Sequence, residues 1–154
     1  MTQQFWAYRP PPAPDARMPS LYHGEPATAA EISAGRAQLR TAAVGSAAVS
    51  GPCDDDLDRL LLVFEELVSN GLRHGSPPVQ VTVTGTAGGW LLQVSDAAVD
   101  RPPTPPVGRD PSTGGMGLNL VAALCPAHGW DVHAGRKVVW GCLEPVPPLG
   151  THRP

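Results

Sequence analysis

The feature that most constrains the fold is a change of hydrophobic period near the middle of the chain. Between about Asp55 and His74, apolar residues recur at intervals of three and four, the spacing of one face of an α-helix. From Val79 onward the period changes to two, with apolar and polar residues alternating as in a half-buried strand. This order predicts a long amphipathic helix that packs against a sheet formed by the residues after it.

The long helical segment has a recognisable start, stripe and end. Acidic residues 54–56 precede it, where carboxylates favour the free amides and the positive end of the helix dipole. Glycine, serine and two prolines at 75–78 then end the helix. The apolar stripe expected to face the core consists of Leu57, Leu60, Leu61, Phe64, Leu67 and Val68.

The other segments predict a small α+β domain. Thr28 to Glu31 has the spacing of a capping box, so a first helix is expected from about Ala29 to Ala43, after a short strand at 21–24. Helices followed by hairpins favour a two-layer α/β sandwich, with the helices on one face of a mixed, mostly antiparallel sheet. The later elements are expected as strands at 79–84 and 90–95, a short helix ending at 124, and a hairpin of 130–133 with 137–142.

The two ends of the chain differ in composition from its middle. Residues 1–20 hold five prolines and few aliphatic residues, which predicts a flexible or polyproline-like tail. Residues 145–154 are expected to form a second tail. One domain is therefore expected over residues 21–144, and a length of 154 residues suits a single domain.

Composition argues against several classes of protein. Eleven basic and fourteen acidic residues give a net charge of −3 without a basic stripe, so nucleic-acid binding is not expected. The N-terminus does not resemble a secretion signal, and no segment is long and apolar enough to suggest a membrane span. Three scattered cysteines form no metal-ligand spacing, which favours a reduced, cytoplasmic protein.

Two polar residues of the long helix form a candidate site. Glu66 and Asn70 are four apart, so a helix places them one above the other, and His74 continues the row. A carboxylate that accepts a proton, beside an amide oxygen that binds a hard cation, suits Mg-ATP chemistry. A solvated helix face has the same pattern, so the pair alone leaves both interpretations open. Glu65 is a rival carboxylate, but one residue turns a helix by about 100°, which takes it out of the row.

Two further signals follow along the chain. Asp96 ends an apolar strand, where its carboxylate could accept the exocyclic amine of adenine, although a turn residue explains it equally well. The run Gly114-Gly115-Met116-Gly117-Leu118 opens a predicted helix, where glycines let backbone amides approach phosphates. Ordinary glycine-rich loops have the same composition. The sequence has neither a P-loop nor the glycine spacing of a Rossmann fold.

The order of these signals resembles a known family more than any single one does. A base–amide helix, a hairpin ending in aspartate, a long loop and glycines that open a helix follow one another in histidine-kinase-like (Bergerat-fold) ATPases. Within that family, the chain is most similar to the small stand-alone bacterial members related to anti-sigma-factor serine kinases. The resemblance covers about residues 21–144 and implies a Bergerat ATP-binding fold, with ATP and Mg²⁺ as cofactors.

The resemblance also implies roles for the candidate residues. Glu66 would be the general base and Asn70 the Mg²⁺ ligand, while Asp96 would read the adenine. Residues 97–113 would form a lid over the nucleotide, hinged at the second glycine box. The residues expected to bind the nucleotide are Asn70, Arg73, His74, Asp96, Gly115, Met116, Gly117 and Leu118.

Three residues depart from the family pattern, all at the purine end of the site. Ala98 and Asp100 stand where the aspartate box has glycines, which reduces the room for close approach of the backbone to adenine. Val138 stands on a strand where many members have a threonine that helps to hold the base. Nucleotide affinity is therefore expected to be low, or to depend on a partner, whereas the Mg²⁺ end keeps its residues.

The resemblance implies an ATP-binding regulatory protein, and two readings of it follow. The first is an anti-sigma-factor-like serine/threonine protein kinase that acts on a small antagonist partner. Its protein partner would be a sigma factor or an anti-sigma antagonist, and a homodimer is also compatible. The alternative is a non-catalytic module that sequesters its partner with weak or no nucleotide binding. Glu66 favours the kinase, and the altered aspartate box favours the module. A histidine-kinase fragment ranks last, because no phosphoacceptor-histidine helix pair is recognisable before the domain.

Overall fold

The computed structural model describes residues 6–13, 17–45, 54–103 and 117–145, and within them it contains three helices and five strands. The elements predicted from the hydrophobic pattern are all present, although β4 begins at Ala127 rather than at Trp130. Their order is β1 (Ser20–Gly24), α1 (Ala29–Gly45), α2 (Asp54–His74), β2 (Gln80–Thr86), β3 (Gly89–Asp96), α3 (Gly117–Leu124), β4 (Ala127–His133) and β5 (Arg136–Leu143).

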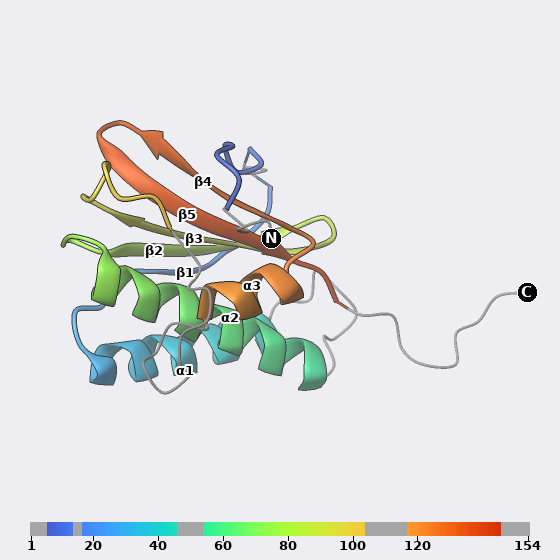
Figure 1. Ribbon diagram of the computed structural model, residues 1–154. Coiled ribbons are helices and arrows are strands. Elements are labelled where there is room, and N and C mark those ends of the chain that lie inside the picture. The colour runs from blue at the N-terminus through green and yellow to red at the C-terminus, as the bar shows by residue number, and fades with distance from the viewer. Residues whose placement is uncertain (1–5, 14–16, 46–53, 104–116, 146–154) are drawn as a thin grey trace, which may run out of the picture.

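The sheet and the helices form two layers (Figure 1). The strand order is β1-β2-β3-β5-β4, and each neighbouring pair is antiparallel. The three helices lie on one face of the sheet, with α2 next to both α1 and α3. The predicted α+β sandwich is therefore confirmed. The parallel pairing in the described part of the chain is a single bridge, between Tyr8 and Trp130.

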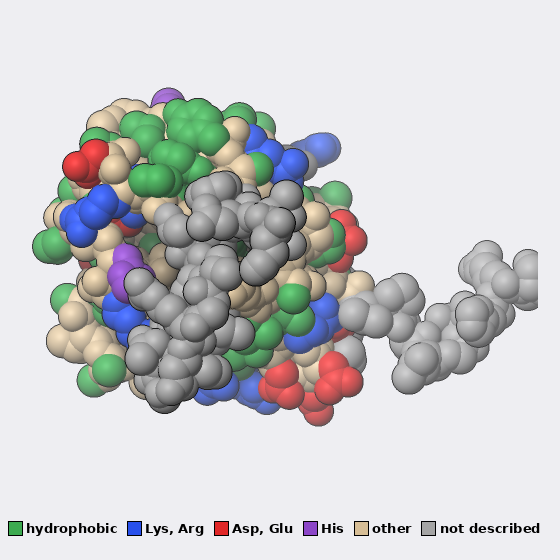
Figure 2. All heavy atoms as spheres, viewed as in Figure 1, with side chains coloured by type: hydrophobic (Ala, Val, Ile, Leu, Met, Phe, Trp, Pro, Cys, Tyr) green, Lys and Arg blue, Asp and Glu red, His purple; other side chains and the backbone are tan. Residues whose placement is uncertain are grey.

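Helix α2 provides one half of the core. All six residues of its predicted stripe are at most 3% exposed. They pack into one cluster with alternate residues of the sheet, among them Val81, Val83, Leu92 and Val94. Each such side chain contributes about 1.5–3 kcal/mol on burial. Acidic side chains gather at the N-terminal end of this helix, and the basic side chains on the same face of the molecule are scattered (Figure 2).

The predicted capping box starts α1. The backbone N–H of Glu31 donates to Thr28 Oγ1 at 3.1 Å, which satisfies one of the free amides of the first turn. The Glu31 carboxylate in turn accepts the backbone N–H of Ala27 at 3.1 Å, one residue before the expected position. The local sequence therefore fixes where this helix begins.

The prediction of a flexible tail over residues 1–20 is wrong for residues 6–9, which lie along the edge of β4. Trp6 is 4% exposed, and its ring centroid is 4.8 Å from that of His128. The backbone of Trp130 exchanges two hydrogen bonds with this segment, at 2.9 and 3.0 Å. Trp140 Nε1 donates to the carbonyl of Arg9 at 3.0 Å. The proline count suggested a tail, but the aromatic residues of the segment supply enough apolar surface to dock it.

The second predicted tail begins at Pro145, and residues 146–154 of it lie outside the described residues. The domain limits of 21 and 144 therefore stay predictions. Among the described helices, none combines the length and the apolar character that crossing a bilayer requires.

Candidate functional site

Helix α2 separates the two neighbouring carboxylates that the sequence offered as candidates. Glu66 and Asn70 are both half-buried, as expected for side chains that border a site. Glu65 is exposed and lies 3.8 Å from the guanidinium of Arg36 on α1, in an ion pair whose side chains are about half exposed. Glu65 therefore faces the neighbouring helix and solvent, whereas Glu66 faces another part of the molecule.

Glu66 lies against the start of α3. A Cβ atom built on Gly117 would lie 3.3 Å from the Glu66 carboxyl carbon and still closer to its Oε2. The glycine therefore leaves the space that the carboxylate uses, at a helix N-terminus whose amides and dipole attract anions. The fold thus joins two predicted site residues from α2 and α3. The Leu118 side chain is 4% exposed within the core, so only its backbone can face a ligand.

The remaining predicted phosphate contacts are less defined by the structure. Arg73 and His74 are exposed in the last turn of α2, beyond Asn70. Basic residues there also favour the negative end of the helix dipole, so their position has a structural explanation too. Gly115 and Met116 lie outside the described residues, as does the part of the predicted lid from 104 to 113. Their roles stay predictions.

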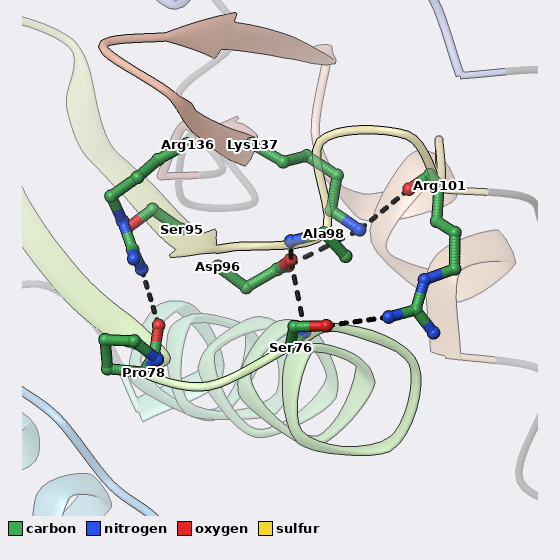
Figure 3. Close-up of polar contacts among 8 residues, drawn as sticks. All are labelled: Ser76, Pro78, Ser95, Asp96, Ala98, Arg101, Arg136 and Lys137. Atoms are coloured by element: carbon green, nitrogen blue, oxygen red, sulfur yellow. Dashed lines mark hydrogen bonds and ion pairs between the residues drawn. The ribbon is translucent and has the colours of Figure 1, made fainter.

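Asp96 ends β3 and is 1% exposed (Figure 3). Its Oδ1 accepts the backbone N–H of Ala98 at 2.7 Å and that of Ser76 at a longer 3.4 Å. A Cβ on Gly75 would lie 2.6 Å from its carboxyl carbon, so the end of α2 presses directly on this side chain. The contact with Ala98 is the local turn that was the alternative explanation for Asp96. Ala98 takes part in this turn without a positive φ. Among the described non-glycine residues, a positive φ occurs at Ala134.

The register between β3 and β5 corrects the prediction for Val138. Asp96 pairs with Lys137, and Ser95 pairs with Val138. Because neighbouring side chains in a strand point to opposite faces, Lys137 shares the face of Asp96 and Val138 does not. Lys137 Nζ lies 3.4 Å from Asp96 Oδ2 and donates to the carbonyl of Arg101 at 2.8 Å (Figure 3). A buried lysine, and not Val138, therefore faces the aspartate.

The Asp96–Lys137 pair is almost entirely removed from solvent, with side chains 2% and 4% exposed. Isolated charges are costly to bury, so the opposite charges and the surrounding hydrogen bonds must offset that cost. Lys137 was not predicted as a site residue, because the pattern of residues 137–142 is that of an ordinary strand. The sequence did contain an indication that Lys137 is buried. It lies on the same alternating positions of the strand as Val139, Gly141 and Leu143, which face the core.

The segment after β3 was expected only to begin a lid, but it also binds the end of α2. Arg101 Nη2 donates to Ser76 Oγ at 2.7 Å, and the backbone N–H of Ala97 donates to the Ser76 carbonyl at 2.9 Å. Arg136, which precedes Lys137 in β5, donates through Nε to Ser95 Oγ at 3.2 Å. These contacts fix the backbone on both sides of Asp96.

The two described cysteines are unsuited to act as nucleophiles. Cys125 and Cys142 are free thiols. Burial, and then the nearby Cys142, raise the pKa of Cys125 to about 12. Burial, and then the charge of Glu144, raise the pKa of Cys142. Both side chains therefore stay protonated and unreactive at neutral pH.

Helix α2 links the two ends of the candidate site. Gly75, which touches Asp96, lies nine residues beyond Glu66, or about 13 Å at a rise of 1.5 Å per residue. Asn70 lies between them. The described residues contain no cluster of three or more His, Cys, Asp or Glu side chains that could hold a metal ion. A divalent cation would therefore need oxygens from a ligand besides Asn70, as Mg²⁺ obtains from phosphates. The donor set suits a nucleotide with Mg²⁺.

Comparison with known proteins agrees with this arrangement. A model of the histidine kinase-like ATPase domain matches residues 26–141, a range that includes Glu66, Asn70, Asp96 and Lys137. The comparison with curated proteins gives no match. Since the matched range spans well over half of the chain, the protein belongs to the histidine kinase-like ATPase domain family, a family of ATP-binding domains.

Proposed function

We propose that the protein is a regulatory serine/threonine kinase that transfers the γ-phosphoryl group of ATP to a hydroxyl of a small protein partner. The observation that supports this best is the position of Glu66. Its carboxylate lies against Gly117 at the start of α3, one helical turn from Asn70. A proton acceptor, a cation ligand and an anion-attracting helix end are thereby close together.

Phosphoryl transfer requires positioning, charge neutralisation and activation of the nucleophile, and the proposal gives a described residue or the bound nucleotide a part in each. ATP, when bound, would supply the transferred group and phosphate oxygens for the cation. Asn70 Oδ1 would ligate Mg²⁺, and amides at the start of α3 would donate to phosphate oxygens. Glu66 would accept the hydroxyl proton as the partner oxygen bonds to the γ-phosphorus and the bond to the β-phosphate bridge breaks.

The partner is proposed from the family resemblance. In partner-switching regulation, a small antagonist domain carries the acceptor serine or threonine, and the kinase also binds a sigma factor. Glu66 lies against Gly117 at the start of α3, whereas Glu65 pairs with Arg36 on α1. A protein partner that brings a hydroxyl to Glu66 would therefore approach α2 from the side of α3.

The buried pair at the other end supports a second candidate function, a module that sequesters its partner with weak or no nucleotide binding. Asp96 already accepts two backbone N–H groups and the ammonium of Lys137. The adenine base of a bound nucleotide must therefore join or replace these internal contacts, which makes the free energy of nucleotide binding less favourable. The two candidates differ in whether ATP is bound and used.

One experiment separates the two functions. Calorimetric titration with Mg-ATP would first measure nucleotide binding by the wild-type protein and by Asn70→Ala, which should bind more weakly because it lacks the oxygen ligand. A partner isolated by pull-down would then be incubated with the wild type and labelled ATP. Transfer of label supports the kinase. If the wild type binds its partner but never labels it, the sequestering module replaces it.

A further inference from the structure

We propose that Lys137 determines base specificity, by donating a hydrogen bond to a ring nitrogen of adenine while Asp96 accepts the adenine amine. This role rests on the proposed function, because it requires a bound adenine nucleotide. It assigns to the site a residue that the sequence pattern did not single out. The buried Nζ of Lys137 lies 3.4 Å from Asp96 Oδ2, so a donor and an acceptor stand side by side.

The hydrogen bonds already present define what the pair can still offer. A lysine ammonium has three N–H donors, and described residues use two, through Asp96 and the carbonyl of Arg101. Asp96 Oδ1 accepts two backbone N–H groups, from Ala98 and Ser76. Only Oδ2 retains capacity for a further donor. The pair therefore presents one donor and one acceptor to a ligand.

This combination suits adenine better than guanine. Adenine has the exocyclic amine as a donor beside ring nitrogen N1 as an acceptor, which matches Asp96 Oδ2 and Lys137 Nζ. Guanine has the O6 acceptor beside N1–H, and an additional donor in its 2-amino group. Since Asp96 Oδ1 is already used, that additional donor would be buried without a partner, which weakens binding.

The protein backbone already satisfies the pair with the same polarity. Ala98 presents an N–H donor to Asp96, and Arg101 presents a carbonyl acceptor to Lys137 at 2.8 Å (Figure 3). In the bound state, adenine N1 would accept the remaining N–H of Nζ, so that the ammonium would have three partners.

The test pairs one ligand atom with one protein group. Binding of Mg-ATP and of Mg-1-deaza-ATP, in which a C–H replaces N1, would be measured by calorimetry for the wild type and for Lys137→Met. The wild type should bind 1-deaza-ATP about tenfold or more weakly, as expected for loss of a hydrogen bond from a charged donor. Lys137→Met should bind both ligands equally, and Lys137→Gln, which keeps an N–H donor, should regain part of the difference.

Each other result overturns the role of Lys137. Equal binding of the two ligands by the wild type would mean that Lys137 only holds Asp96 in place. Tighter ATP binding by Lys137→Met would mean that Lys137 obstructs the base. If Lys137→Met does not fold, the wild type and Lys137→Gln still decide the question. If the wild type binds no ATP, both the role of Lys137 and the kinase function are refuted. If the wild type binds ATP more tightly than 1-deaza-ATP but never labels its partner, only the kinase function is refuted.

Discussion

The two ends of the candidate site differ in how completely the protein satisfies them itself. At one end, Glu66 and Asn70 are half-buried on α2, and Glu66 faces a space left by Gly117. At the other, Asp96 and Lys137 are buried, form an ion pair with each other, and make three hydrogen bonds with the surrounding chain. The first end keeps its polar groups available for chemistry, while the second uses its groups to hold the fold together.

This difference gives the two ends different tests. A substitution at the Glu66 end should change activity and leave stability nearly unchanged. A substitution at the Asp96 end should change stability first, because unpaired buried charge is costly. The comparison fails if both ends respond in the same way.

Glu66→Gln should reduce phosphate transfer to the partner by about 10²- to 10⁴-fold, because it removes a general base while keeping the size of the side chain. ATP affinity and the free energy of unfolding should change little. Transfer would be followed with labelled ATP, and binding by calorimetry. Transfer at the wild-type rate would show that Glu66 is an ordinary half-buried residue and that the base lies elsewhere.

Lys137→Met should destabilise the protein by about 3–5 kcal/mol, because it leaves the carboxylate of Asp96 buried without its counter-charge. The matched control is the double variant Asp96→Asn with Lys137→Met, which removes both charges and keeps an oxygen for the N–H of Ala98. Denaturant unfolding should show that the double variant recovers most of the loss. A loss below about 1 kcal/mol for Lys137→Met would contradict the structural role of the pair.

These two residues also show how far the sequence could predict the site. Glu66 and Asn70 are four apart on one helix, so local periodicity alone placed them together. The proximity of Asp96 and Lys137 depends on the register of β3 against β5, and the two residues are 41 positions apart in the chain, with a helix between them. A shift of one residue would have exchanged Lys137 for Val138 on that face, and the sequence did not specify the register.

The fold shows the same limit. The helix and strand pattern predicted the sandwich and nearly all element boundaries, because period and capping are local properties. The docking of Trp6 against β4 was missed, because it depends on a contact with His128 that lies far along the chain. The proline content of the first 20 residues indicated a tail, and the tertiary contact of two aromatic rings overrode that local preference.

Glycine-to-alanine substitutions test the two ends with the same added atom. In Gly75→Ala the new Cβ would lie 2.6 Å from both the Asp96 carboxyl carbon and the Gly71 carbonyl oxygen, so backbone must move. This should cost about 1–3 kcal/mol, in the range of overpacked sites. In Gly117→Ala the new atom meets the mobile end of Glu66, so stability should fall by less than about 1 kcal/mol.

Gly117→Ala should nevertheless slow phosphate transfer, because it displaces the Glu66 carboxylate from the start of α3. Gly88→Ala is the control for both, since a Cβ there would meet no atom within 4 Å. Thermal or denaturant unfolding and the transfer assay would be run on all three. A larger loss of stability in Gly117→Ala than in Gly75→Ala would reverse the comparison of the two ends.

The smallest effect is expected for Glu65→Gln, next to the proposed base. Glu65 pairs with Arg36 at 3.8 Å, and both side chains are about half exposed, so the pair is screened by water and salt. Its removal should cost about 0–1 kcal/mol, and that loss should shrink as salt is added. Phosphate transfer should stay close to the wild-type rate, because Glu65 is turned about 100° around α2 from Glu66. Denaturant unfolding at low and high salt, with the transfer assay in parallel, measures both. If Glu65→Gln lost transfer and Glu66→Gln kept it, the two carboxylates would exchange roles, and the nucleophile would be activated on the α1 side of the helix.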